Sequence, residues 1–198
     1  MRLLTPTILA TLFLMLSNRA DATVIFVANM TGAQENPSNS STATGFAHFE
    51  LNDAMTALTF SGTVFGLDFT GTQTPGTTLD NLVNAHIHAP APPGMNAGVR
   101  FGFIGMPFND LNPNDAVVTP FASGVGGTFS AKWDLLEGNG TTLTAQLPSL
   151  LGGQAYINFH TEQFPGGEIR GQILVPEPST LLLLGIGLAA AAVRRRFL

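Results

Sequence analysis

The stretch YINFHTEQFPGGEIRGQ, residues 156–172, contains two short runs of alternating apolar and polar side chains on either side of a Pro-Gly-Gly turn. Alternation with a period of two is typical of a strand that buries one face, and Pro165 followed by two glycines favours a turn. The segment therefore predicts an antiparallel β-hairpin. The register that places polar residues together pairs His160 with Glu168, Asn158 with Arg170, and Tyr156 with Gln172. We expect that polar face to meet solvent and the opposite face, which carries Ile157, Phe159 and Ile169, to meet the core.

Similar runs recur along the chain between loops rich in Gly, Pro and Asn. About eight short strands predict an all-β domain, and we expect an antiparallel β-sandwich of the Greek-key or Ig-like kind. One segment, residues 141–151, instead has leucines at helical spacing before Gly152 and Gly153, which predicts a single short helix. The expected strands are residues 23–30, 45–51, 58–64, 82–88, 99–104, 128–135, 154–160 and 168–175.

The first 22 residues have the composition of a secretory signal peptide. Arg2 precedes an apolar run at residues 3–16, and Ala20 and Ala22 are the small residues that a signal peptidase recognises. The alternative is a membrane anchor, but a run of this length is short of the roughly 20 residues that span a bilayer. We expect cleavage after Ala22, which leaves residues 23–175 as one domain.

The C-terminal residues 176–198 form a tail of three parts. Pro176, Glu177 and Pro178 come first, an apolar stretch of 13 residues at 181–193 follows as a predicted helix, and then come Arg194, Arg195 and Arg196. Arginines at the end of such a helix stay on the cytoplasmic side. This order resembles the PEP-CTERM sorting signal of Gram-negative bacteria. The resemblance implies a transient hold in the inner membrane, processing by an exosortase near Pro-Glu-Pro, and a final place at the cell surface or in an exopolysaccharide matrix.

Charge and cysteine content limit the partners of the domain. Residues 23–175 contain 11 acidic and 3 basic residues, a net charge of −8, and the chain has no cysteine. An acidic surface argues against nucleic acid and anionic polysaccharide as direct electrostatic partners. The stability of this exported domain must come from its core or from bound ions, because no disulfide can form.

Several phrases together resemble the CHRD domain, named after repeats in chordin. They are Gly-Ala-Gln-Glu-Asn-Pro at 32–37, Ala-His-Ile-His at 85–88, His-Thr at 160–161 and Gly-Gly-Glu-Ile-Arg-Gly at 166–171. The resemblance covers residues 24–174 and implies a β-sandwich-like extracellular domain. In chordin such domains belong to an extracellular binding protein, so the resemblance defines a fold more closely than a function.

Three histidines are candidates for a metal site. His86 and His88 are two residues apart, which places both imidazoles on one side of a strand, and His160 lies on another strand with Glu168 across the hairpin. Neutral imidazoles with a carboxylate suit zinc or copper. The alternative is that these groups only hydrogen-bond across strands, with Glu168 bound to His160 or Arg170.

The loop Asn-Asp-Leu-Asn-Pro-Asn-Asp at 109–115 has acidic and amide residues at alternate positions, as calcium loops do, but it lacks their glycine and distal glutamate. Ordinary turn chemistry is the better interpretation. No nucleophile motif, phosphate-binding loop or carboxylate dyad is evident, so we expect no enzymatic activity. The leading expectation is a structural or binding role, with an exopolysaccharide or a surface protein as partner, and the alternative is a metal-binding, redox-active domain.

Overall fold

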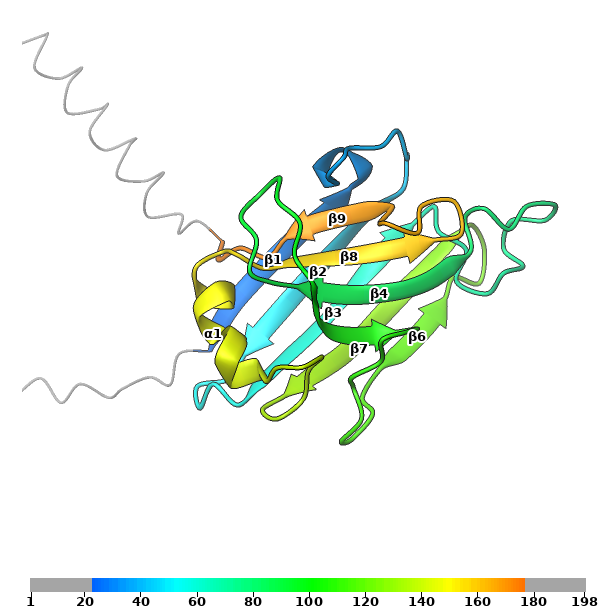
Figure 1. Cartoon of the computed structure of the whole chain (residues 1–198). Helices are drawn as coiled ribbons and strands as arrows, with labels where there is room; N and C mark the ends of the chain where they lie inside the picture. The colour runs from blue at the N-terminus through cyan, green and yellow to red at the C-terminus, as the bar shows by residue number, and fades with distance from the viewer. Residues whose placement is uncertain (1–22, 177–198) are drawn as a thin grey trace, which may run out of the picture.

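The computed structural model describes residues 23–176, which form one antiparallel sheet and one short helix (Figure 1). The predicted signal peptide and the predicted tail helix at 181–193 lie outside the described residues. Within 23–176 no helix combines the length and the hydropathy that crossing a bilayer requires. The strands are β1 (Val24–Thr31), β2 (Thr44–Leu51), β3 (Ala57–Phe65), β4 (Leu82–His88), β5 (Val99–Ile104), β6 (Val117–Pro120), β7 (Gly126–Asp134), β8 (Tyr156–Thr161) and β9 (Ile169–Gln172).

The expected two-sheet sandwich is wrong, although the all-β class is confirmed. The nine strands form a single sheet in the order β5-β4-β8-β9-β1-β2-β3-β7-β6. The last hairpin joins the first strand, because Thr31 of β1 pairs with Arg170 of β9 and Val27 bridges to Leu174. The pairing of β1 with β9 therefore joins into one sheet the strands that a sandwich would divide between two sheets.

The sheet curls into a half-barrel, which buries the faces that a sandwich would have buried between two sheets (Figure 1). Strands far apart in the sheet meet across the core: the rings of Phe60 on β3 and Phe103 on β5 lie 5.0 Å apart between centroids. Phe101 on β5 stacks on Trp133 of β7, also at 5.0 Å. Alternation along a strand predicts which face is buried, but it does not predict whether a second sheet or the curl of the same sheet covers that face.

The register predicted for the last hairpin is confirmed, since Tyr156 pairs with Gln172 and Asn158 with Arg170. The expectation that its polar face meets solvent is wrong, because every residue of β8 and β9 is buried. The segment after β4 covers this face, and the Gln172 amide donates hydrogen bonds to the carbonyls of Ala91 and Gly153 at 2.9 and 2.8 Å. The outer side of the hairpin is therefore a buried polar layer, and it contains the candidate site.

Two smaller elements complete the fold. The predicted helix is α1 (Leu143–Leu151), which begins after Thr142, whose hydroxyl accepts a hydrogen bond from the amide of Ala145, and ends at Gly152. A 3-10 turn, η1 (Gly32–Gln34), follows β1 and leads the chain over the polar side of the last hairpin. The sequence pattern did not predict β6, a short exposed edge strand within the region expected to be loop.

Candidate metal centre

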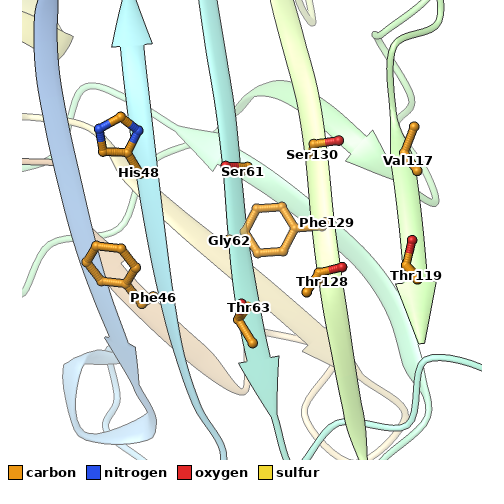
Figure 2. Close-up of a pocket in the computed structure, with 10 residues that line it drawn as sticks. All are labelled: Phe46, His48, Ser61, Gly62, Thr63, Val117, Thr119, Thr128, Phe129 and Ser130. Carbon is orange, nitrogen blue, oxygen red and sulfur yellow. The ribbon is translucent and has the colours of Figure 1, made fainter. Parts of the chain in front are cut away.

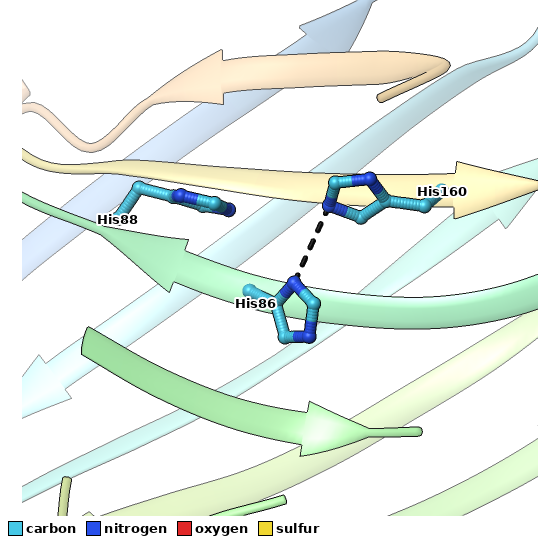
Figure 3. A group of neighbouring side chains, drawn as sticks. All are labelled: His86, His88 and His160. Atoms are coloured by element: carbon cyan, nitrogen blue, oxygen red, sulfur yellow. Dashed lines mark hydrogen bonds between the residues drawn. The ribbon is translucent and has the colours of Figure 1, made fainter. Parts of the chain in front are cut away.

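The structure brings His86, His88 and His160 together on the outer side of β4 and β8, which are neighbours in the sheet (Figure 3). His86 and His88 project to the same side of β4 because they are two residues apart. The antiparallel register pairs His160 with Asn84, His86 with Asn158, and His88 with Tyr156. The three imidazoles therefore lie on one side of the sheet, and they are 3%, 7% and 7% exposed.

One nitrogen from each imidazole lies within 4.8 Å of the other two, a spacing that suits ligands of one metal ion. The closest pair is His86 Nδ1 and His160 Nε2, at 3.3 Å. The ring nitrogens of zinc ligands lie about 2.0–2.1 Å from the metal. Nitrogens around one tetrahedral ion are then roughly 3.3–3.4 Å apart. The His86–His160 pair already has this spacing, and the rings would have to move inward where the separation approaches 4.8 Å.

The opposite nitrogen of each ring is held by a backbone carbonyl from a different loop. His86 Nε2 lies 3.1 Å from the oxygen of Met106, His88 Nδ1 lies 3.0 Å from that of Ala97, and His160 Nδ1 lies 3.0 Å from that of Pro165. A carbonyl only accepts, so these three nitrogens carry the protons. The lone pairs of the neutral rings then belong to the three nitrogens that face one another. Histidine ligands of metals are commonly oriented in this way.

The three imidazoles are neutral at pH 7. Burial lowers the pKa of His88 to about 3 and that of His86 to about 4, and His160 beside His86 lowers the latter further. Burial also lowers the pKa of His160. Three unprotonated nitrogens that converge in a buried site repel one another, and His88 Nε2 has no hydrogen-bond partner among the described residues. A bound cation would remove both costs.

Glu168, the expected fourth ligand, lies apart from this group. Its carboxylate accepts a hydrogen bond from the hydroxyl of Ser41 at 2.6 Å and a short one from the hydroxyl of Thr161. It therefore anchors the segment before β2 to the end of β8. It pairs with neither His160 nor Arg170, the two partners that the purely structural interpretation gave it.

A second group of polar residues, which was not predicted as part of a site, lies beside the histidines. The Asn158 amide donates to Glu35 Oε1 at 2.6 Å, and burial raises the pKa of Glu35 to about 7, against the lowering effect of Arg170. The Arg170 guanidinium lies 3.5 Å from the centre of the Tyr156 ring, and His88 stacks on Tyr156 at 4.7 Å. Tyr156 therefore links the histidine cluster to a buried positive charge. The predicted register already placed Tyr156, Asn158 and Arg170 on one polar face, whereas Glu35 lay in a phrase that carried no assigned role.

Two other regions are separate from the histidines. In the loop at 109–115, Asp110 accepts a hydrogen bond from the amide of Asp115 at 3.0 Å and Asn114 accepts from that of Ala116 at 3.1 Å, which is turn chemistry. An open groove of about 460 Å³ runs over the outer faces of β2, β3, β7 and β6 (Figure 2). The fourth histidine, His48, borders this groove with a side chain that is 39% exposed.

The fold and the buried polar hairpin define an all-β domain, and comparison with known families identifies it. Residues 26–173 match the CHRD domain, so the chain belongs to the CHRD family. Residues 174–196 match the PEP-CTERM protein-sorting motif. Such proteins are exported, processed by exosortase and associated with the cell surface. No curated protein and no solved structure matches the chain.

Proposed function

We propose that this protein is a non-enzymatic metal-binding domain displayed at the cell surface or in the exopolysaccharide matrix, and that it holds one zinc or copper ion through His86, His88 and His160. The observation that supports this most directly is the set of three carbonyl contacts, which leave one bare nitrogen on each ring facing the other two. Hydrogen bonding across strands would account for the contact of His86 Nδ1 with His160 Nε2, but not for the third nitrogen, His88 Nε2, which has no hydrogen-bond partner among the described residues.

Burial favours a binding role over catalysis. None of the three rings is more than 7% exposed, so a substrate larger than a water molecule has little access to an ion between them. Catalytic zinc sites keep an open position for water and substrate, whereas structural sites are closed. Three neutral imidazoles suit zinc and copper, and copper(II) would bind more tightly by the general order of divalent affinities.

The test is the metal content and the thermal stability of the purified protein. We expect about one equivalent of zinc or copper per chain, a lower melting temperature after chelation, and recovery when zinc is added back. His160→Gln should abolish all three effects. His48→Gln is the matched control, because His48 lies on β2 outside the cluster and should leave binding intact. If the wild-type protein contains no metal and neither ion stabilises it, the proposed function is wrong.

The groove in Figure 2 supports a second role, binding of a neutral polysaccharide. Phe46, Thr63, Thr128 and Thr119 form one row across its four strands, and hydroxyls from Ser61 and Ser130 lie in the next row. Hydroxyls donate and accept hydrogen bonds as sugars do, and Phe46 is 46% exposed. Phe46→Ala should weaken retention on a neutral exopolysaccharide matrix, and equal retention of wild type and variant would exclude this role.

A further inference from the structure

Asn158 occupies the position that completes a ring around the candidate metal centre. It lies directly opposite His86 in the pairing of β4 with β8, and it is two residues from His160 on the same side of β8. On β4 the next residue of that side is His88, which lies diagonally across from Asn158. The point midway between His88 and His160 therefore has His86 on one side and Asn158 on the other.

Contacts of its nitrogen with Glu35 and with the turn at Gly167 fix the orientation of the Asn158 carboxamide. Its Nδ2 donates to Glu35 Oε1 at 2.6 Å, and the turn residue Gly167, whose φ is +129°, leaves space for this contact. A Cβ on Gly167 would lie 2.5 Å from Asn158 Nδ2 and 2.6 Å from Glu35 Oε1. Because the amide nitrogen is directed toward Glu35 and the turn, the amide oxygen is directed away from them.

The amide oxygen of Asn158 has no hydrogen-bond partner among residues 23–176, although the side chain is only 2% exposed. A buried carbonyl without a partner is uncommon in native proteins and calls for an unseen ion or water. Three histidines also leave one position of a tetrahedral metal site to be filled. The unpartnered oxygen therefore belongs to a residue that the strand register places opposite His86 and next to His160, beside the three histidines.

We propose that Asn158 Oδ1 is the fourth ligand of the metal ion, which gives the site three nitrogen donors and one oxygen donor; this rests on the proposed function. Glu35 then acts as the outer carboxylate that orients a ligand and strengthens it as a donor, because its hydrogen bond to Nδ2 draws electron density toward the amide oxygen. Mixed nitrogen and oxygen donors suit zinc(II) and copper(II), whereas copper(I) prefers sulfur ligands.

Asn84 provides a matched control at the edge of the histidine cluster. It also lies on the histidine side of β4, and its Oδ1 likewise has no partner among the described residues. Asn84, however, is paired with His160 at the end of the array, two residues from His86 in the direction away from His88. The two asparagines therefore share chemistry and burial of the oxygen but differ in their position relative to the three ring nitrogens.

The experiment compares zinc affinity and the visible spectrum of the cobalt(II)-substituted protein for the wild type, Asn158→Leu and Asn84→Leu. Leucine keeps the branching of asparagine at Cγ, with a larger volume, and removes both the oxygen and the nitrogen of the amide. We expect Asn158→Leu to weaken zinc binding at least about 10-fold and to change the cobalt absorption bands, while Asn84→Leu resembles the wild type in both. Melting of the metal-free proteins checks the folding of each variant, and Asn158→Ala replaces Asn158→Leu if the latter does not fold.

The outcomes separate this inference from the proposed function. If the wild type binds no zinc, both are wrong. If the wild type binds zinc but the Asn158 variant keeps its affinity and its cobalt spectrum, the three-histidine site stands and Asn158 is not a ligand. Equal weakening in the Asn158 and Asn84 variants would also overturn the inference, because it would reflect a general disturbance of the polar layer.

Discussion

Replacing His88 by phenylalanine distinguishes a metal ligand from a residue that only holds the fold together. His88 stacks on Tyr156 with ring planes 1° apart, and a phenyl ring has a similar shape and can keep this stack. The change removes two features of the imidazole: the hydrogen bond from Nδ1 to the carbonyl of Ala97, and the buried Nε2 that has no partner.

These two losses have opposite effects on the metal-free protein. A neutral hydrogen bond stabilises by about 0.5–1.5 kcal/mol net, and an unpaired buried acceptor costs about 1–3 kcal/mol. The hydroxyl of Tyr156 lies 3.4 Å from the Ala97 carbonyl and can continue to serve it. We therefore expect His88→Phe to leave the unfolding free energy of the metal-free protein within about 1 kcal/mol of the wild type, or to raise it.

With metal present the order should reverse. Zinc at 100 times its dissociation constant adds about 2.7 kcal/mol to the stability of a protein that binds it only when folded. For a domain of this size that corresponds to a rise of roughly 5–11 °C in melting temperature. His88→Phe should lose this increment, so the variant matches or exceeds the wild type in chelator and falls below it in zinc.

The assay is urea unfolding and thermal melting of both proteins, in chelator and in a zinc series. His48→Phe controls for the loss of an imidazole outside the cluster and should respond to zinc as the wild type does. A variant that is less stable than the wild type by the same amount with and without zinc would show that His88 is a structural hydrogen-bonding residue and not a metal ligand.

Three further predictions concern other parts of the chain. Burial raises the pKa of Asp110 from its ordinary 3.8 to about 6. Because the carboxyl of the unfolded chain ionises at lower pH than that of the folded protein, the free energy of unfolding falls as pH rises from about 4 to 6. In urea unfolding, Asp110→Asn should therefore be more stable than the wild type by up to about 3 kcal/mol at pH 7.5 and should show no gain below pH 4. Gly167→Ala should cost about 2–3 kcal/mol because its Cβ meets Asn158 and Glu35 at a positive φ, whereas Gly166→Ala, with open space around it, should be nearly neutral; equal losses would contradict this. Mass spectrometry of the native protein should find neither residues 1–22 nor the terminal arginines, and intact ends would overturn the predicted processing.

Local sequence patterns predicted the parts of the fold that depend on local physics. Alternation predicted eight of the nine strands, and it predicted the register of the last hairpin because a one-residue slip would have moved Ile157 and Phe159 out of the core. The helical spacing of the leucines and the stop at Gly152 predicted α1, because both are local features of the sequence. Whether strands belong to one sheet or two depends on contacts such as that of Thr31 with Arg170, which join residues 139 positions apart in the sequence.

In the candidate site, too, local sequence predicted some features and contacts between distant segments determined the others. The spacing of His86 and His88 was sufficient to place them on one side of a strand. The contribution of His160 required the pairing of β4 with β8, and the choice of which nitrogen is bare required carbonyls from three separate loops. Glu168 was misjudged because the predicted register places it opposite His160, whereas its carboxylate is bound by Thr161 and by Ser41, which comes from a segment that packs there only in the complete fold.

The lack of cysteine gives the histidine cluster a role that the sorting signal alone does not suggest. A domain that is secreted and then displayed outside the cell cannot rely on the cell to refold it, and most small exported domains have covalent cross-links. One ion held by β4 and β8 would connect those strands. Through the ring hydrogen bonds it would also connect them to the loops at Ala97, Met106 and Pro165. The ion would therefore add a cross-link between the central strands and the loops that cover the polar hairpin.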